Sequence, residues 1–319
     1  MAESSLHTLL EGVIDYAGLF PPAQLDMEAA VARYAEHRAS DECWMLDRFV
    51  LPVARLEEFE RVARSQLAAD DEAAEKGKSR KSHGREGTPV GPWHLAALVG
   101  ADVEGDATRV LQFNSRHATG RRVDVIVESV EARAATSAEV ERFAKAFRDN
   151  GAQPCVELPL GGDPRPLVDT ACACGVHAKA RTGGVTADAF PAAADVARFV
   201  VACAQAGVPF KATAGLHHAL RGEHRLTYAA DSPRATMFGF MNLLLAAALA
   251  REGAPVADVE RVLDERDPSS LAFDEHGATW RERRITTTSL ARARREGLTA
   301  IGSCSFAEPV DELKVLGWL

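Results

Sequence analysis

Short apolar runs rich in β-branched residues alternate with longer stretches of helical periodicity between residues 120 and 215. The pattern predicts strands at residues 123–129, 154–160, 176–181 and 208–213. Between them it predicts helices with apolar residues at helical spacing, at residues 137–149, 164–173 and 192–206. Strands and helices that alternate in this way are typical of βα units that form a parallel sheet.

Four further strands complete this pattern. They are predicted at residues 13–20, 44–53, 93–100 and 299–306. Eight strands with intervening helices in a chain of 319 residues predict a (β/α)₈ barrel, a fold of about 250 residues that tolerates insertions. A doubly wound open sheet is the alternative. Its nucleotide-binding versions lose support because the chain has neither a Gly-x-Gly-x-x-Gly nor a Gly-x-x-x-x-Gly-Lys motif.

Two segments interrupt the alternation of strands and helices. Residues 69–91 are charged and poor in apolar residues, so we expect a mobile surface loop. Residues 219–298 contain apolar helical stretches, so we expect a helical insertion between the seventh and eighth strands, near the mouth of the barrel. Asn242, at the start of the first stretch, is expected to cap that helix. We expect residues 1–319 to form a single barrel domain that carries both segments.

The composition restricts the partners of the chain. It is 46% hydrophobic and 26% charged, as in a soluble globular protein, and its net charge of −9 offers no extended basic surface to nucleic acid. No apolar run approaches the roughly 20 residues that a membrane helix needs. The N-terminal residues lack the features of a secretory signal, so we expect a cytoplasmic protein without membrane or nucleic-acid partners. A homo-oligomer is compatible with these features.

Charged residues inside the predicted strands are the main chemical signal. In a barrel, catalytic groups project from the C-terminal ends of the strands. Period-two alternation places polar side chains on one face of successive strands: Asp124 and Glu128, Glu157, Lys179 and Arg181, and Lys211 and Thr213. A buried charge is costly unless it is paired. We therefore expect these side chains to converge in a polar site inside the barrel.

Lys179 and Lys211 end neighbouring predicted strands. Desolvation, or a second cation nearby, disfavours the charged form of a lysine and leaves an amine that can attack a carbonyl group. Two adjacent lysines therefore suit Schiff-base chemistry. The alternative is that both lysines simply pair with Glu157, Asp124 or Glu128 as structural ion pairs.

The turn after the sixth predicted strand is a candidate anion receptor. Arg181 offers a guanidinium fork, and the backbone N–H groups of Thr182, Gly183 and Gly184 precede a helix. An ordinary glycine turn is the alternative. Ser303, near the eighth strand, offers a further hydroxyl group, whereas the neighbouring Cys304 is expected to be a packed small residue. We therefore expect an anionic small-molecule substrate.

His217 and His218 directly follow the seventh predicted strand. Because adjacent side chains of an extended segment point in opposite directions, we expect one of the two to act as an acid, base or ligand. If one of them joined Glu157, Glu128 or Asp15, a divalent metal could bind, and a metal-dependent hydrolase or isomerase is therefore an alternative. No compact metal motif supports that site, so we expect neither a metal nor another cofactor.

Short motifs in a fixed order resemble the deoxyribose-phosphate aldolase group of class I aldolases. They are Ile14-Asp15, Val123-Asp124-Val125-Ile126, Val156-Glu157, Lys179 with Thr182-Gly183, Lys211-Ala212, and Gly302-Ser303. The resemblance implies that Lys179 forms an imine, that Lys211 lowers the pKa of Lys179, and that Asp124 relays protons. It gives Asp15 a supporting role. The glycine pair that holds phosphate in that group is replaced here by Ala214-Gly215-Leu216-His217-His218, which argues against a phosphorylated aldose.

The chain also resembles a bacterial protein family through the segments DYAGLFPP, RTGG, FKATAGLHH, FGFMN and GSCSF.

Together the charged strand positions, the lysine pair and the aldolase-like motifs predict a barrel lyase that forms a Schiff base with a small anionic carbonyl compound. In that prediction Lys179 is the nucleophile, and Glu157, Asp124 and His217 move protons. The alternatives are the metal-dependent enzyme and a barrel that binds a metabolite without catalysis.

Overall fold

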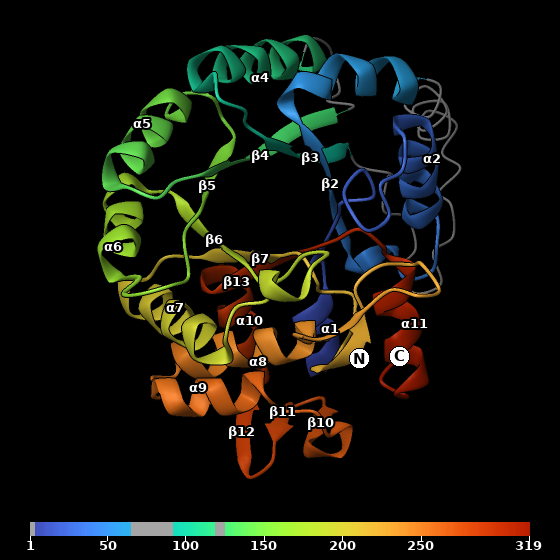
Figure 1. Ribbon diagram of the computed structural model, residues 1–319, viewed down its shortest axis with the longest axis vertical. Helices are drawn as coiled ribbons and strands as arrows, with labels where there is room; N and C mark the ends of the chain where they lie inside the picture. Colours follow the sequence, from blue (N-terminus) through green and yellow to red (C-terminus); the bar gives the residue numbers. More distant parts are fainter. Residues whose placement is uncertain (1–3, 65–91, 119–124) are drawn as a thin grey trace.

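A closed barrel of eight parallel strands forms the centre of the molecule. The computed structural model describes residues 4–64, 92–118 and 125–319. The strands follow one another around the barrel in the order β1-β13-β7-β6-β5-β4-β3-β2 (Figure 1). They are β1 (Ile14–Tyr16), β2 (Leu46–Pro52), β3 (Trp93–Leu98), β4 (Val125–Arg133), β5 (Gln153–Glu157), β6 (His177–Arg181), β7 (Phe210–Thr213) and β13 (Leu298–Ser303). The predicted (β/α)₈ barrel is confirmed, and the open sheet is excluded.

Helices surround this barrel (Figure 1). They are α1 (Ser5–Leu10), α2 (Met27–Arg38), a helical segment at residues 56–64, α4 (Val103–His117), α5 (Ser137–Phe147), α6 (Arg165–Cys174), α7 (Ala193–Ala206), α8 (Phe240–Arg251), α9 (Val256–Leu263), α10 (Thr287–Glu296) and α11 (Ala307–Val315). Short 3₁₀ helices lie at Cys43–Met45, Val53–Arg55, Ala187–Ala189 and Pro268–Ser270. Helix α8 is buried from Phe240 to Ala250, because it contacts α7, α9, α10 and β13.

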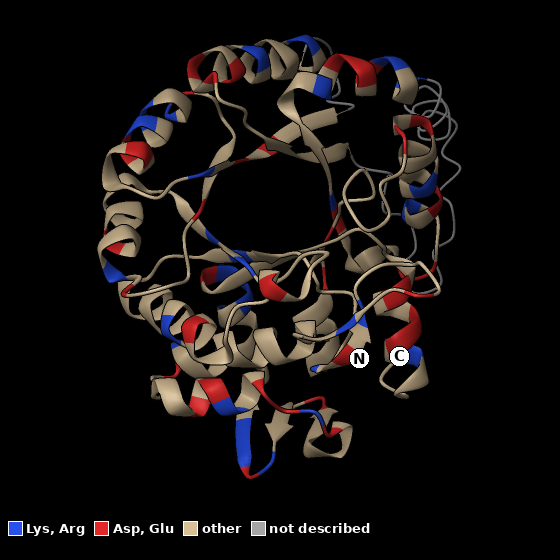
Figure 2. Cartoon of the chain, in the orientation of Figure 1, with Lys and Arg blue, Asp and Glu red and all other residues tan. Residues whose placement is uncertain are grey.

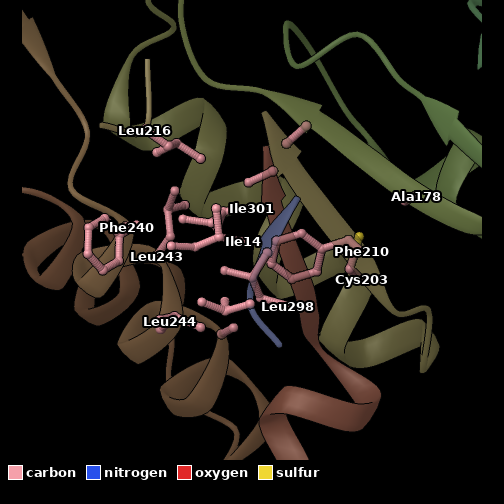
Figure 3. Packing of buried hydrophobic residues seen from close by; sticks show 14 of the residues in the cluster. Ile14, Ala178, Cys203, Phe210, Leu216, Phe240, Leu243, Leu244, Leu298 and Ile301 are labelled. Atoms are coloured by element: carbon pink, nitrogen blue, oxygen red, sulfur yellow. The ribbon is translucent and has the colours of Figure 1, made fainter. Parts of the chain in front are cut away.

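The hydrophobic core lies between the outer face of the strands and the helices. Figure 3 shows Ile14 of β1, Phe210 of β7 and Ile301 of β13 packed together with Leu243 of α8 and Cys203 of α7. Successive residues of a strand face opposite sides of the sheet. With these apolar residues directed outward, the alternate positions of the same strands face the barrel interior and are free to carry polar groups.

A β-bulge interrupts β4 and changes which of its residues face inward. Leu95 of β3 is paired with Val127, but the next residue, Ala96, is paired with Ser129, so Glu128 is the extra residue. The backbone N–H and C=O groups of Val127 are bonded instead to the side chain of Asn114, at 2.8 and 2.9 Å. Beyond the bulge, odd-numbered residues of β4 take the inward positions.

The segment between β7 and β13 holds strands as well as helices. It begins with the antiparallel pair β8 (Gly222–Arg225) and β9 (Arg234–Met237) and continues with α8 and α9. A three-stranded antiparallel sheet and α10 follow; the sheet strands are β10 (Leu271–Asp274), β11 (Gly277–Trp280) and β12 (Arg283–Thr286). Helices α8 to α10 and the sheet lie outside the barrel (Figure 1), and residues 214–221 connect the C-terminal end of β7 to the β8–β9 hairpin.

Asn242 does not cap α8, contrary to the sequence-based expectation. The N-cap position is Gly239, which has no side-chain cap. The Asn242 side chain is fully buried, and its amide oxygen accepts a hydrogen bond from the backbone N–H of Arg221 at 2.9 Å. Its amide nitrogen donates to the backbone carbonyl oxygens of Val262 and Glu265 at 2.7 and 2.9 Å. It therefore ties three segments of the insertion together.

The predicted loop at residues 69–91 and the candidate site residue Asp124 lie outside the described residues. Within the described ranges, no helix has the length and apolar character needed to cross a membrane.

Candidate active site in the barrel interior

One row of charged residues crosses four adjacent strands of the barrel. Arg133 of β4 is paired in register with Glu157 of β5, Glu157 with Lys179 of β6, and Lys179 with Lys211 of β7. Residues in register on neighbouring strands point to the same face of a sheet. In Figure 2, blue and red segments mark charged positions on these strands as well as on the outer helices. The register therefore brings Glu157, Lys179 and Lys211 together, as predicted.

The two lysines are bridged by a carboxylate that the sequence-based prediction missed. Both lysines are buried, and Lys179 Nζ lies 2.7 Å from Glu131 Oε2 and 3.0 Å from Glu157 Oε2. Lys211 Nζ lies 2.5 Å from Glu131 Oε1 and 2.5 Å from Asp15 Oδ2. Each oxygen of Glu131 therefore holds one lysine, and each lysine is held by two carboxylates.

These contacts keep both lysines protonated. Burial alone lowers the pKa of Lys179, but the charges of Glu131 and Glu157 outweigh it, and the net pKa is raised. The pKa of Lys211 is raised in the same way by Asp15 and Glu131. Lys211 does lower the pKa of Lys179, as expected, but one cation is outweighed by two carboxylates. The neutral amine expected from the sequence is therefore wrong, because these contacts favour an ammonium group at Lys179.

The pKa values of the partner carboxylates are lowered, whereas those of the lysines are raised. Burial alone raises the pKa of Glu131, but Lys179 and Lys211 outweigh it and hold the pKa well below its usual range. Burial also opposes the ionised form of Glu157, and Lys179 and Arg181 lower its pKa. The resting site is thus a set of alternating ammonium and carboxylate groups.

Two arginines meet on the remaining oxygen of Glu157. Arg133 Nε and Arg181 Nε each donate a hydrogen bond to Glu157 Oε1 at 3.1 Å. The Glu157 side chain is 10% exposed, whereas those of Arg133 and Arg181 are 76% and 44% exposed. Within the described part of the chain, only the Nε atoms of these two guanidinium groups form hydrogen bonds. The site therefore opens to solvent through two cationic groups with unused N–H donors.

The bulge explains why Glu131 and Arg133 could not be predicted from alternation. Counting from Asp124 and Glu128 in steps of two leads to even-numbered residues, and a one-residue insertion reverses the faces. The signal that could have found both residues is their charge within a strand that continues to Arg133.

Glu128 lies away from the lysines, contrary to the expected convergence. It contacts Arg48 Nη2 at 3.2 Å and His94 Nδ1 at 2.6 Å, near the N-terminal ends of β2 and β3. Asp15 connects this group to the lysine pair, because its Oδ1 accepts a hydrogen bond from the Arg48 N–H at 3.1 Å. Asp47 beside Arg48 is held by burial and by the charge of Asp15 at a pKa raised to about 6.

His217, in the segment after β7, lies beside the C-terminal end of β13 and contacts α11. Its Nδ1 is 3.1 Å from Ser303 Oγ and 3.3 Å from Glu308 Oε2, and its ring lies 3.8 Å from the buried Cys304 Sγ. Burial alone lowers the pKa of His217, but its hydrogen bonds with Cys304 and Glu308 raise it to about 9. His217 and Ser303 thus form a polar group on the rim of the barrel, and their side chains contact each other, Cys304, the backbone N–H of Ser305 and Glu308 of α11.

His218, like His217, contacts α11. Its ring is stacked on His224 of the β8–β9 hairpin, with ring centroids 3.3 Å apart, and its Nδ1 is 3.4 Å from Glu312 Oε1. These contacts attach the hairpin to α11.

The glycine turn after β6 is explained by packing. The buried Thr182 hydroxyl donates to the Ala214 carbonyl oxygen at 2.9 Å. A Cβ atom on Gly183 would lie 2.5 Å from the Phe190 ring, and one on Gly184 would lie 2.7 Å from Ala189 Cβ. The structure therefore accounts for Thr182, Gly183 and Gly184 without a ligand.

Thr213 differs from the glycine turn because its hydroxyl is unused. Its buried Oγ1 has no hydrogen-bond partner among the described residues. Thr213 is in register with Arg181 on one side and with Gly302 on the other, and a Cβ on Gly302 would come within 2.9 Å of Thr213 Cγ2. The free hydroxyl group of Thr213 thus lies two residues beyond Lys211 along β7, on the same inward face.

The described side chains include no group of three or more His, Cys, Asp or Glu residues placed to hold a metal ion. In the lysine site, the ammonium groups already occupy the carboxylate oxygens that a cation would need.

No protein-family model and no curated protein sequence matches the chain. Among solved structures, the chain is similar to deoxyribose phosphate aldolase from Aeropyrum pernix, whose structure is described as a unique tetramer. The TM-score is 0.46 and the sequence identity is 16%, over 97% of this chain and 93% of that chain. The assignment of the fold therefore rests on the closed strand order of this chain itself.

Proposed function

We propose that the barrel is a lyase that forms a Schiff base between Lys179 and a small anionic carbonyl compound. One observation carries this proposal: two buried lysines on adjacent strands share a single carboxylate near the C-terminal ends of the barrel strands. Catalytic groups of (β/α)₈ enzymes come from these strand ends. Perturbed lysines and carboxylates in such a place are typical of functional sites.

The carboxylates around Lys179 provide the path for its proton. An ammonium group cannot attack a carbonyl group, so Lys179 must first pass a proton to Glu131 or Glu157, both of which are within 3.0 Å. Lys211 remains charged between Asp15 and Glu131, and its charge favours loss of the proton from Lys179. We assign Lys179 as nucleophile, Glu157 as proton acceptor and Lys211 as the tuning cation.

The charge of the opening favours an anionic substrate. Arg181 presents its unused N–H groups beside Glu157, and the free hydroxyl group of Thr213 is its neighbour in register. A guanidinium fork binds carboxylates and phosphates more strongly than neutral groups. His217 and Ser303 on the rim are further proton donors for a substrate that extends toward β13.

Reductive trapping tests this function. The protein is incubated with a panel of aldehydes and ketones and with borohydride, and the modified peptide is identified by mass spectrometry. We expect a stable adduct on Lys179 that is lost in Lys179→Met and retained in Lys314→Met, which changes a lysine that is 47% exposed. Absence of an adduct across the panel, or full activity of Lys179→Met, would reject the proposal.

A second candidate is a barrel that binds a metabolite without catalysis. It is favoured by the complete pairing of both lysines, since every ammonium group already has two carboxylate partners. In that case the ion pairs serve the fold alone, and no carbonyl compound becomes attached to Lys179.

A further inference from the structure

One carboxylate connects the solvent-exposed arginines to the buried nucleophile. Glu157 Oε1 accepts from Arg133 Nε and Arg181 Nε at 3.1 Å, and Glu157 Oε2 lies 3.0 Å from Lys179 Nζ. Anything that changes the bonds on one oxygen of Glu157 changes the affinity of the other oxygen for a proton. Arg133 has no role in the function proposed above.

We propose that Arg133 and Arg181 together bind the carboxylate of a short 2-oxo acid, and that this binding makes Glu157 the acceptor of the Lys179 proton. The inference rests on the proposed imine function and names its substrate class and its trigger. Arg133 is in this view a specificity-determining residue, and Glu157 links recognition of the anion to activation of the amine.

The spacing of the groups selects the substrate class. Lys179 Nζ and the two guanidinium groups contact opposite oxygens of one carboxylate, at 3.0 and 3.1 Å. A ligand that reaches both therefore needs its carbonyl carbon and its anionic group close together. A 2-oxo acid has this spacing, whereas the phosphate and carbonyl groups of a sugar phosphate are several bonds apart. The planar guanidinium fork also matches a planar carboxylate.

Electrostatics gives the direction of the proton transfer. A ligand carboxylate on the unused N–H groups of the arginines offsets their positive charge and places a negative charge closer to Glu157 than to Lys179. Both effects favour neutralisation of the Glu157–Lys179 pair, because they raise the proton affinity of the carboxylate more than that of the amine. Among the described residues, Glu131, Lys211 and Cys155 also interact with Lys179, and Asp15 lies behind Lys211.

The step balances without any other reactant. Lys179 gives one proton to Glu157, and its lone pair forms a C–N bond to the carbonyl carbon of the 2-oxo acid. Glu157 returns that proton to the carbonyl oxygen, a second proton passes from nitrogen to the same oxygen, and water leaves. The product is a protonated imine that keeps the third proton of the original ammonium group.

A pair of matched reagents tests this inference. Pyruvate and methyl pyruvate have the same ketone, but only pyruvate carries a free carboxylate. The full chain is incubated with each reagent and sodium cyanoborohydride over a range of pH, and labelling of Lys179 is measured by mass spectrometry. We expect pyruvate to label Lys179 at lower pH than methyl pyruvate does.

Two variants separate recognition from proton transfer. Arg133→Met should raise the half-saturating concentration of pyruvate by about tenfold or more, because a charge-assisted hydrogen bond to the ligand carboxylate is lost, and should change the half-saturating concentration of methyl pyruvate far less. Glu157→Gln should make the two pH profiles coincide. Arg198→Met is the control, since Arg198 is an exposed arginine, 44% exposed as Arg181 is, but is paired with Asp195 on α7.

The possible failures are distinguishable. Coincident pH profiles in the unmodified chain, or an equal effect of Arg133→Met on both reagents, overturn this inference and leave the imine function standing. If neither reagent labels Lys179 at any pH, both proposals fall. The Arg133 side chain is 76% exposed, so Arg133→Met keeps the test valid even if Glu157→Gln fails to fold.

Discussion

Two buried carboxylates of this chain have similar burial and different partners. Glu131 inside the barrel is 2% exposed, and Glu265 in the insertion is 6% exposed. Glu131 binds two buried lysines. Glu265 accepts from Trp280 Nε1 at 3.0 Å and Arg281 Nε at 2.8 Å, and the backbone N–H groups of residues 266 and 267 donate to its other oxygen.

The comparison shows that burial and a lowered pKa do not by themselves mark a functional site. Burial opposes the ionised form of both carboxylates, and their partners overcome it; hydrogen bonds to Arg281 and Trp280 lower the pKa of Glu265 to about 2. The donors around Glu265 cannot act as nucleophiles, so that group only fixes the chain. The donors around Glu131 are amines, each with a second carboxylate that can take its proton. The chemistry of the partners separates the two cases.

The largest effect on stability is expected for Glu131→Gln. The change leaves Lys179 and Lys211 facing each other without the carboxylate that neutralises both. Breaking a buried ion pair costs about 3–5 kcal/mol of unfolding free energy. Urea denaturation of the variant measures this loss. A loss below about 1 kcal/mol, the scale of an exposed ion pair, would contradict the buried bridging role of Glu131.

The cost of Glu131→Gln should also depend on pH. The folded pKa of Glu131 is depressed, so ionised Glu131 stabilises the fold above its ordinary pKa of 4.5, and this contribution is lost as pH falls toward the folded value. The variant lacks this contribution at every pH. The difference in unfolding free energy between the two proteins should therefore be constant near neutrality and should narrow below about pH 4.5. If the difference in unfolding free energy instead widened below pH 4.5, it would contradict a lowered pKa of Glu131 in the folded protein.

A smaller effect is expected in the insertion, for Asn242→Ala. The change removes three hydrogen bonds and leaves the Arg221 N–H and two carbonyl oxygens without their partner. Unpaired buried polar groups cost about 1–3 kcal/mol each, and partial relaxation gives about 2–3 kcal/mol in total. Thermal or urea unfolding measures this loss. The variant should still be labelled at Lys179, because Asn242 belongs to the insertion.

The barrel could be predicted because its strands repeat a simple pattern. Predicted strands such as residues 176–181 and 208–213 correspond to β6 and β7 within two residues. Because strand ends in a parallel barrel come together, Lys179 and Lys211 could be placed in one site from the order of the strands alone. Apolar periodicity decides which residues form elements, and the closed topology then brings them together.

The rest of the site depends on features that periodicity does not encode. The bulge at Glu128 reverses the faces of β4, so simple alternation misses Glu131 and Arg133 and places Glu128 with the lysines. The short strands of the insertion, such as β8 and β12, are only four residues long and follow no clear alternation of apolar and polar residues. The protonation of Lys179 depends on distances to carboxylates from other strands, which a sequence does not give.

A still smaller loss is expected for Glu265→Gln. The amide can still accept from Trp280 Nε1, and Arg281, whose side chain is 61% exposed, can be solvated by water. We therefore expect about 1–2 kcal/mol of lost unfolding free energy, measured by urea denaturation. A loss as large as that of Glu131→Gln would mean that burial, and not the chemistry of the partners, decides the cost.

The smallest effect on stability is expected for Lys179→Met. After this change Glu131 keeps Lys211, and Glu157 keeps its two arginines, so every carboxylate of the site retains a cation. The methionine side chain fills most of the space of the lysine stem. We expect a loss below about 1 kcal/mol in urea unfolding, together with complete loss of imine labelling.

Arg281→Met is the matched change for Lys179→Met in the insertion, because Glu265 likewise keeps its Trp280 and backbone donors. It should cost a similarly small amount of stability and leave labelling intact. A loss of about 3 kcal/mol or more for Lys179→Met alone, the cost of a broken buried pair, would identify Lys179 as a structural cation. The barrel interior would then be the same kind of region as the insertion, and the second candidate function would replace the first.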